Sequence, residues 1–202
     1  MRNPFSRAAI CCALSIVGLA AIASGQAPAP AAPVSTAVAN PTYISIPLEI
    51  TVNRPAAEVW KRVGKYCDIG EWLQFPCTIT AGKDGEFGAV RSIGREVLVG
   101  MTELSYTYTQ PVTEGRPYIL YHGTLEARPL TATTSKLLYT LVLDNSTLGD
   151  EAAKERDRAN RAAQFTRALE NMKILAEGGT LPPAPARGGG GKGGGKGGAP
   201  KQ

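Results

Sequence analysis

Residues 76 to 144 hold an uninterrupted series of extended segments, and this series restricts the fold more than any other feature of the sequence. The segments have a β-like pattern of apolar and polar side chains, and turn residues such as Asp84-Gly85 separate them. Strands are predicted over residues 76–83, 88–93, 95–100, 104–111, 118–128 and 133–144. Strands joined by such short connections form an antiparallel sheet, which must bury one face against another element.

That covering element is predicted directly after the strands. Asp150 is suited to cap a helix that continues to about Glu177. The first half of this helix is almost entirely polar, whereas its second half carries a single apolar stripe. The stripe consists of Phe165, Leu169, Met172 and Leu175. At about 1.5 Å per residue, the helix spans roughly 40 Å, which is enough to cross a small sheet.

A seventh strand and two short helices precede the series. Apolar residues alternate with polar ones from Ile44 to Val52, the pattern of a half-buried strand. Arg54-Pro55 then predicts the start of a helix. Residues 68–71 (Asp-Ile-Gly-Glu) resemble a capping box and predict a second, very short helix that carries Trp72. The sequence therefore predicts an α+β domain with a seven-stranded antiparallel sheet and a long C-terminal helix.

The N-terminal segment has the pattern of a secretory signal peptide. Arg2 and Arg7 precede an apolar run over residues 8–23 that is too short to span a bilayer comfortably. The run ends in Ala21-Ile22-Ala23, a small-residue cleavage pattern, and an alternative cut follows Gly25. We therefore expect residues 1–23 to be a signal peptide and the mature protein to be periplasmic or secreted.

Two alternatives to a cleaved signal peptide remain open. A permanent membrane anchor is disfavoured because Ala/Pro-rich sequence follows the apolar run instead of a stop-transfer cluster. Lipidation of Cys11 or Cys12 is disfavoured because a lipidated cysteine closes the apolar region, whereas eleven mostly apolar residues follow Cys12. We expect no stable membrane insertion after cleavage.

Composition divides the rest of the chain into three parts. Residues 24–41 form an Ala/Pro-rich linker, residues 42–178 a globular domain, and residues 179–202 a Gly/Lys/Pro tail. The tail is expected to be disordered because it cannot bury enough apolar area to offset its chain entropy. Six of the 22 basic residues lie in the leader and tail, which leaves 16 against 17 acidic residues. A near-neutral domain without a clustered basic face argues against nucleic-acid binding. We also expect the protein to be a monomer.

Cys67 and Cys77 would be the only cysteines of the exported chain. Two cysteines in an oxidising compartment are most simply a disulfide. The alternative, a metal-binding pair, lacks neighbouring ligands, because His122 is the only histidine. We therefore expect a Cys67–Cys77 disulfide, no metal site and no other cofactor.

Four strings along the domain follow one another in an order shared with a known superfamily. They are residues 50–60, residues 66–72, Gly88-Ala89-Val90-Arg91 and Ser105-Tyr106-Thr107-Tyr108. They resemble the strand-to-helix segment, the second helix, the Gly-x-x-Arg strand and the aromatic strand of the START-related superfamily. This superfamily, also called SRPBCC, includes the polyketide cyclases. The resemblance implies the helix-grip fold, a sheet wrapped around the long last helix, although residues 73–75 intervene where family members often carry an earlier proline.

The resemblance also implies a cavity between the curved sheet and the last helix. Its expected lining is Phe165, Leu169 and Met172 on the helix, Tyr106, Tyr108 and Tyr121 on the strands, and Arg91 and Trp72 nearer the mouth. Tyrosines there would supply apolar rings and orienting hydroxyls, although tyrosines also occupy exposed sheet faces. Arg91 could meet a ligand carboxylate, or it could pair with a strand carboxylate, for which Glu96 and Glu103 are candidates.

No nucleophile elbow, zinc signature, paired-acid motif or dinucleotide fingerprint occurs in the sequence. The leading hypothesis is therefore non-catalytic binding of a small hydrophobic, aromatic or lipid-like molecule. A polyketide cyclase or aromatase-like enzyme that uses the same cavity is the alternative. A third hypothesis is a non-catalytic interaction protein of the cell envelope, with the basic tail touching anionic surfaces.

The signal-peptide hypothesis predicts the N-terminus of the exported protein. We expect cleavage after Ala23 or Gly25, so that the mature chain begins at Ser24 or Gln26. N-terminal sequencing of the exported protein checks this prediction. Retention of Met1, or a lipid on Cys12, would contradict it.

Overall fold

The computed structural model describes residues 35–184. The predicted signal peptide, residues 24–34 of the predicted linker and residues 185–202 of the predicted tail lie outside the described residues. The helices are α1 (Ala56–Val63), α2 (Ile69–Trp72) and α3 (Glu151–Ala176). The strands are β1 (Tyr43–Val52), β2 (Ile79–Ala81), β3 (Val90–Arg91), β4 (Val97–Thr102), β5 (Ser105–Thr109), β6 (Tyr121–Pro129) and β7 (Ser135–Asp144).

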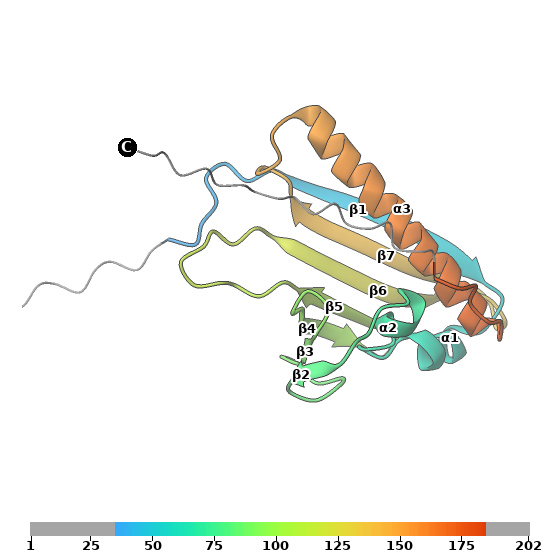
Figure 1. Cartoon of the computed structure of the whole chain (residues 1–202). Helices are drawn as coiled ribbons and strands as arrows, with labels where there is room; N and C mark the ends of the chain where they lie inside the picture. The colour runs from blue at the N-terminus through green and yellow to red at the C-terminus, as the bar shows by residue number, and fades with distance from the viewer. Residues whose placement is uncertain (1–34, 185–202) are drawn as a thin grey trace, which may run out of the picture. The chain divides into compact units, whose positions relative to one another are not determined.

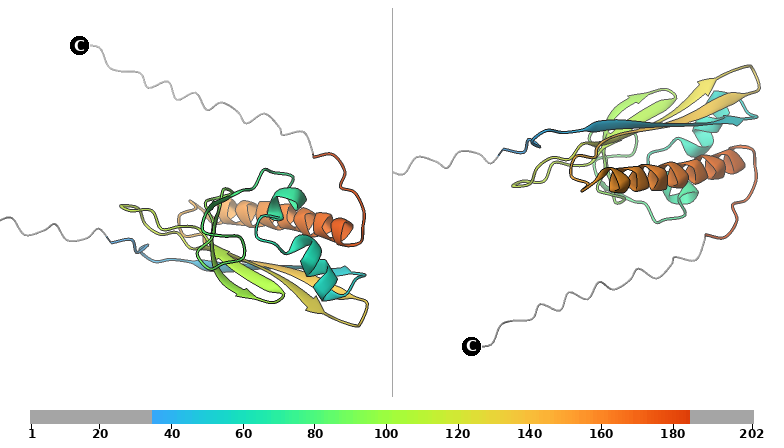
Figure 2. Two further views of the ribbon diagram at one scale, coloured as in Figure 1. Left: turned by 90° about the horizontal axis from the view of Figure 1, so that it is seen from below. Right: turned by 90° about the horizontal axis from the view of Figure 1, so that it is seen from above.

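The seven strands form one antiparallel sheet in the order β1-β7-β6-β5-β4-β3-β2 (Figure 1). Both views of Figure 2 show α3 along one face of this sheet, with α1 and α2 on the same side. The predicted α+β fold with a long C-terminal helix is confirmed. Between residues 35 and 184, no helix combines the length and the apolar character that a bilayer span requires.

The core lies between α3 and the inner face of the sheet. The long strands β1, β7 and β6 pair without a break, so that Ile46 and Gly123 both face Leu141 in register. Side chains on the inner face are therefore every second residue, such as Leu137, Tyr139 and Leu141 on β7. Strand β1, for which alternating apolar and polar residues were predicted, forms one edge of this core.

Helix α3 begins as predicted, because the Asp150 carboxylate accepts a hydrogen bond from the Ala153 backbone N–H at 2.7 Å. Its buried residues all lie in the second half, from Phe165 onward. Asn171 is also buried on this face, where its side-chain amide donates to the backbone carbonyl of Trp72 at 2.8 Å. This hydrogen bond links α2 to α3. The apolar stripe of α3 did not indicate such a link.

Several local predictions differ from the structure. Strands β2 and β3 are shorter than predicted, and a long connection over residues 82–89 joins them, rather than a tight turn at Asp84-Gly85. The capping box at residues 68–71 does not form. The Asp68 carboxylate instead accepts from the backbone N–H of Lys65 at 2.8 Å, which closes the turn before α2. Residues 118–120 precede β6 and are not part of it.

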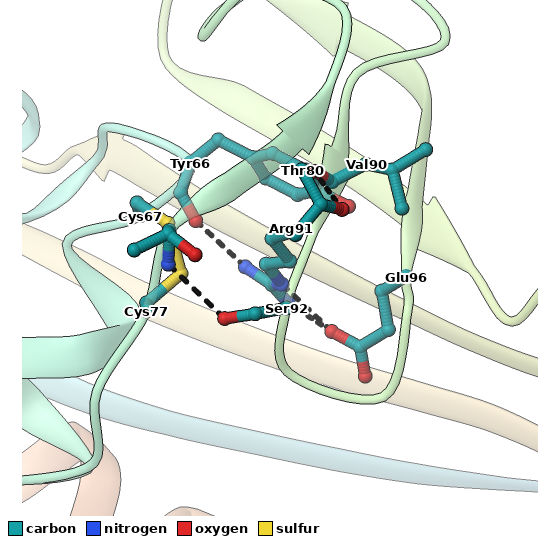
Figure 3. The surroundings of a disulfide bond; sticks show 9 residues. Tyr66, Cys67, Cys77, Thr80, Val90, Arg91, Ser92 and Glu96 are labelled. Carbon is teal, nitrogen blue, oxygen red and sulfur yellow. Dashed lines mark hydrogen bonds and ion pairs between the residues drawn. A yellow bond between two sulfur atoms is a disulfide. The ribbon is translucent and has the colours of Figure 1, made fainter.

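The Cys67–Cys77 disulfide is confirmed, with the two α-carbons 5.5 Å apart. Cys67 precedes α2 and Cys77 precedes β2, so the bond joins the helical segment to the far edge of the sheet. Figure 3 shows the disulfide beside Tyr66, Arg91 and Ser92. The Ser92 hydroxyl accepts a hydrogen bond from the backbone N–H of Thr78 at 3.1 Å, next to Cys77.

The first residues of the predicted tail lie against the domain. Leu181 is partly buried against the core. The Gln74 side-chain amide donates to the backbone carbonyl of Pro182 at 2.7 Å. These contacts place the start of the tail beside the α2–β2 connection.

The disulfide predicts a measurable stability difference. Replacing both cysteines, Cys67→Ser with Cys77→Ser, should lower the free energy of unfolding by about 2–3 kcal/mol, because the closed loop is short. Denaturant unfolding followed by circular dichroism measures this difference. The wild-type protein under reducing conditions should match the double variant, and equal stability of the oxidised wild type and the variant would contradict the prediction.

Candidate functional site

The inner face of the sheet carries a cluster of tyrosine side chains. Tyr106 and Tyr108 point inward from β5, and Tyr139 points inward from β7. The Tyr108 and Tyr139 hydroxyls hydrogen-bond to each other at 2.8 Å across the intervening strand β6. At the crossing point β6 has Gly123, where an added Cβ would lie 2.3 Å from the Tyr108 hydroxyl oxygen. Gly123 therefore lets the Tyr108 ring lie flat against the strand and reach Tyr139.

Arg91 on β3 is fully buried inside this cluster. Its guanidinium lies 4.4 Å from the ring centres of Tyr66 and Tyr108 and 5.8 Å from that of Tyr106. We call these three rings the tyrosine cage. Aromatic faces attract a desolvated cation, so the cage offsets part of the cost of burying Arg91.

The Arg91 charge is also paired directly. Its Nη2 lies 2.6 Å from the Glu96 carboxylate and its Nε donates to the same carboxylate at 2.7 Å. Its Nη1 donates to the Tyr66 backbone carbonyl at 2.9 Å, a contact visible in Figure 3. Burial raises the pKa of Glu96, and the attraction of Arg91 opposes this only in part. Two partners were predicted for Arg91, a ligand carboxylate or a strand carboxylate. The structure shows the second, with Glu96 as the partner.

The buried hydroxyls of the cluster stay protonated at neutral pH. Burial is the main cause that raises the pKa of Tyr66, Tyr106, Tyr108 and Tyr139 above its ordinary value. The positive charge of Arg91 lowers the pKa of each hydroxyl but does not offset burial. These groups are therefore hydrogen-bond donors and acceptors rather than bases.

Two pockets flank Gln164 of α3. The first, which we call the α2 pocket, has a volume of about 320 Å³ and lies between α3 and the α2–β2 connection. Its lining includes Trp72, Leu73, Ile93, Gln164 and Ala168. The second, the β6 pocket, also about 320 Å³, lies between α3 and the start of β6. Its lining includes Gln110, Tyr121, Arg161, Gln164 and Phe165.

Polar groups lie beside the α2 pocket and in the β6 pocket. The indole Nε1 of Trp72 is buried and has no hydrogen-bond partner within the described part of the chain. In the β6 pocket, the Arg161 guanidinium lies 5.2 Å from the Tyr121 ring centre and is paired with Asp157 at 2.7 Å. Burial raises the pKa of the Tyr121 hydroxyl, while hydrogen bonding to Tyr108 and Arg161 acts in the opposite direction. The α2 pocket therefore suits an apolar ligand with one polar group, whereas the lining of the β6 pocket is mainly polar.

The structure distributes the residues that the sequence singled out over four places. Trp72 lines the α2 pocket, although it is fully buried rather than at a rim. Tyr121 and Phe165 line the β6 pocket. Arg91, Tyr108, Leu169 and Met172 are buried between sheet and helix, and Tyr106 lines a different pocket beside α1. The helix wall and the tyrosine wall do face each other, since the Tyr139 and Phe165 rings lie 4.5 Å apart.

Sequence reasoning missed four residues that shape this region. Tyr139 is central to the cluster, and its position two residues from Leu137 and Leu141 on one strand face was an available signal. Tyr66, which holds Arg91 through its ring and carbonyl, had no such signal because it lies in a loop. The polar helix residues Gln164 and Asn171 gave no signal, because amphipathic patterning marks only the apolar side chains of a helix.

His122 lies outside this site. It points to the outer face of β6, where the Tyr118 hydroxyl is 3.4 Å from its Nε2. Burial lowers the pKa of the His122 imidazole. Within residues 35–184, no group of three or more His, Cys, Asp or Glu side chains is arranged to hold a metal ion.

Comparisons with known proteins bear on the fold. No protein-family model matches the chain, and a search of curated proteins finds no match. Among solved structures, a Thermobifida fusca protein determined by NMR superposes with a TM-score of 0.54 at 24% identity, covering 65% of this chain and 92% of that one. An aromatase/cyclase from a Streptomyces species superposes with a TM-score of 0.51 at 18% identity, covering 69% of this chain and all of its own. These superpositions confirm the predicted helix-grip fold of the described domain.

Proposed function

We propose that the domain binds a small, largely apolar molecule between α3 and the inner face of the sheet. The observation that carries the proposal is the α2 pocket, whose aromatic wall at Trp72 continues into the buried cluster, with the more polar β6 pocket on the other side of Gln164. Each pocket lies near the lower end of the size range of small-molecule sites, and a ligand that moved the Gln164 side chain aside would join them.

The ligand should carry one hydrogen-bond acceptor. The unpartnered Trp72 Nε1 can only donate, and a buried donor without a partner costs stability that a ligand carbonyl or ether oxygen would restore. At the rim, Arg167 lines the α2 pocket and forms no ion pair within the described residues. A flat aromatic ketone or a lipid-like molecule with a polar head fits both features.

The buried Arg91 supports the site without touching the ligand. Its charge is already paired with Glu96, and its Nε and Nη1 donate to Glu96 and Tyr66, so a ligand carboxylate would compete with an existing ion pair. Arg91 and Glu96 instead hold the tyrosine cage in place beneath the pockets. We therefore assign Arg91 a positioning role.

The same cavity is compatible with the cyclase-like alternative, which remains a prediction. The disulfide is consistent with an oxidising compartment, so the proposal includes a periplasmic or secreted location. The envelope-interaction alternative depends on residues 185–202, which lie outside the described part of the chain.

Gln164 provides a direct test of the binding proposal. Because Gln164 is exposed and borders both pockets, Gln164→Trp should fill their common mouth and leave the fold intact. We expect it to weaken binding of phenylnaphthylamine, an uncharged fluorescent apolar probe, by about tenfold, or about 1.4 kcal/mol. Fluorescence titration measures the affinity, and the indole N–H resonance of Trp72 should shift on binding to the wild type.

The matched control is Thr166→Trp, because Thr166 is an exposed residue of α3 that lines neither pocket. This variant should bind the probe like the wild type. Equal affinity of both variants, or probe binding that leaves the Trp72 resonance unmoved, would overturn the proposed function.

The buried hydroxyls predict the behaviour of the protein in alkali. Five of the seven tyrosines have a raised pKa in the folded state, so at high pH the unfolded state releases these protons first. Stability should be fully present below about pH 10 and fall as the pH rises further. Phenolate absorbance of these tyrosines should therefore rise together with the loss of circular dichroism. Ionisation of all seven tyrosines in a protein that keeps its native spectrum would contradict this.

A further inference from the structure

A third pocket lies on the other side of the tyrosine cage. It occupies about 380 Å³ between the end of α1 and the β4–β5 hairpin, and we call it the α1 pocket. Its lining includes Trp60, Lys61, Lys65, Tyr66, Met101 and Tyr106. It shares no lining residue with the α2 pocket or the β6 pocket, so it is a separate site and does not depend on the function proposed above.

An irregularity in β4 opens this pocket. The pairing of β4 with β5 shifts between Leu98 and Gly100, so that Leu98 faces Tyr108 and Met101 faces Tyr106. Tyr106 and Tyr108 both point inward, and the bulge therefore brings Leu98 and Met101 to the inner face although they are three residues apart. Leu98 is buried, but Met101 remains 42% exposed. Because no other element fully covers Met101 on the inner face, its side chain forms the apolar floor of an open pocket.

The indole of Trp60 forms a side wall. An added Cβ at Gly64 would lie 2.4 Å from the Trp60 ring, so only glycine allows the ring to fold back over the end of α1. In this position the Trp60 ring centre is 5.7 Å from that of Tyr106, and Tyr106 in turn lies 5.4 Å from Tyr66. All three residues line the α1 pocket and give it an aromatic wall suited to a flat ring system.

The rim of the pocket is positively charged. Lys61 and Lys65 are exposed, and neither ammonium group forms an ion pair within the described residues. Asp84 also lines the pocket, which leaves an excess of one positive charge. Deeper in the wall, the Tyr66 hydroxyl is buried and lacks a hydrogen-bond partner among the described residues. The carboxylate of a ligand could form ion pairs with the two lysines while the ring attached to it packs against Met101 and Trp60.

We propose that the α1 pocket binds a small aromatic carboxylic acid. The aromatic body is selected by the three rings and Met101, and the single negative charge is selected by the lysine pair. The site thus differs chemically from the α2 pocket, which is lined by Trp72, and from the β6 pocket, where the cation Arg161 is already paired with Asp157.

The two tryptophans of the chain make a test possible, because Trp60 lines the α1 pocket and Trp72 the α2 pocket. Their indole N–H resonances can be followed separately in the full-length protein, and Trp60→Phe assigns them. Titration with naphthoate should shift the Trp60 resonance first. Lys61→Glu with Lys65→Glu should weaken this binding by about tenfold. Uncharged naphthalene methanol should bind wild type and variant equally at this site.

The matched control is Arg156→Glu with Arg158→Glu, which makes the same change in net charge at exposed positions of α3 away from the pocket. It should leave naphthoate binding within about twofold of the wild type. The proposal is overturned if naphthoate shifts only Trp72, if it shifts neither resonance, or if both double variants lose affinity equally. A shift of Trp60 in a protein whose Trp72 never responds to phenylnaphthylamine would support this site and reject the function proposed for α3.

Discussion

One face of the seven-stranded sheet has to be covered, and α3 can cover only part of it. The apolar stripe of α3 begins at Phe165, and the preceding turns carry charged residues such as Asp157 and Arg161. The second half of the helix therefore packs closely on the sheet, whereas the first half cannot exclude water from it. The α2 and β6 pockets lie where the helix changes from polar to apolar, on either side of Gln164. The uneven polarity of one helix thus produces both the core and the candidate site.

The buried Arg91–Glu96 ion pair favours one arrangement of the side chains beneath the pockets, which apolar packing alone would not do. A buried charge is tolerated only when it is paired and hydrogen-bonded, so the side chains around Arg91 have little freedom to rearrange. The disulfide contributes to this order, because it follows directly after Tyr66, whose carbonyl and ring both contact Arg91. On the other side, Gly123 and Tyr139 hold the Tyr108 ring. The α1 pocket shares no lining residue with the pockets under α3, and this separation is why we propose different ligands for the two regions.

Much of the fold could be predicted from the sequence because it rests on local patterns. The alternation from Ile44 to Val52, the capping residue Asp150 and the stripe from Phe165 to Leu175 each depend on residues a few positions apart. The edge strands β2 and β3 were less predictable, since Asp84-Gly85 lies in a longer loop that the glycines permit. The disulfide could be predicted from the number of cysteines and the expected compartment, without knowledge of the fold.

The sequence by itself thus determined the element order, the covering helix, the disulfide and the chemical character of the interior side chains. Only the tertiary structure decided which of them meet. Tyr108 and Tyr139 are 31 residues apart and touch because β6 carries a glycine between them. Arg91 pairs with Glu96 because the short β3–β4 connection brings them together. Glu103, the other candidate, lies exposed in the turn between β4 and β5. Strand register and one bulge settle these contacts, and both depend on long-range pairing that no local pattern contains.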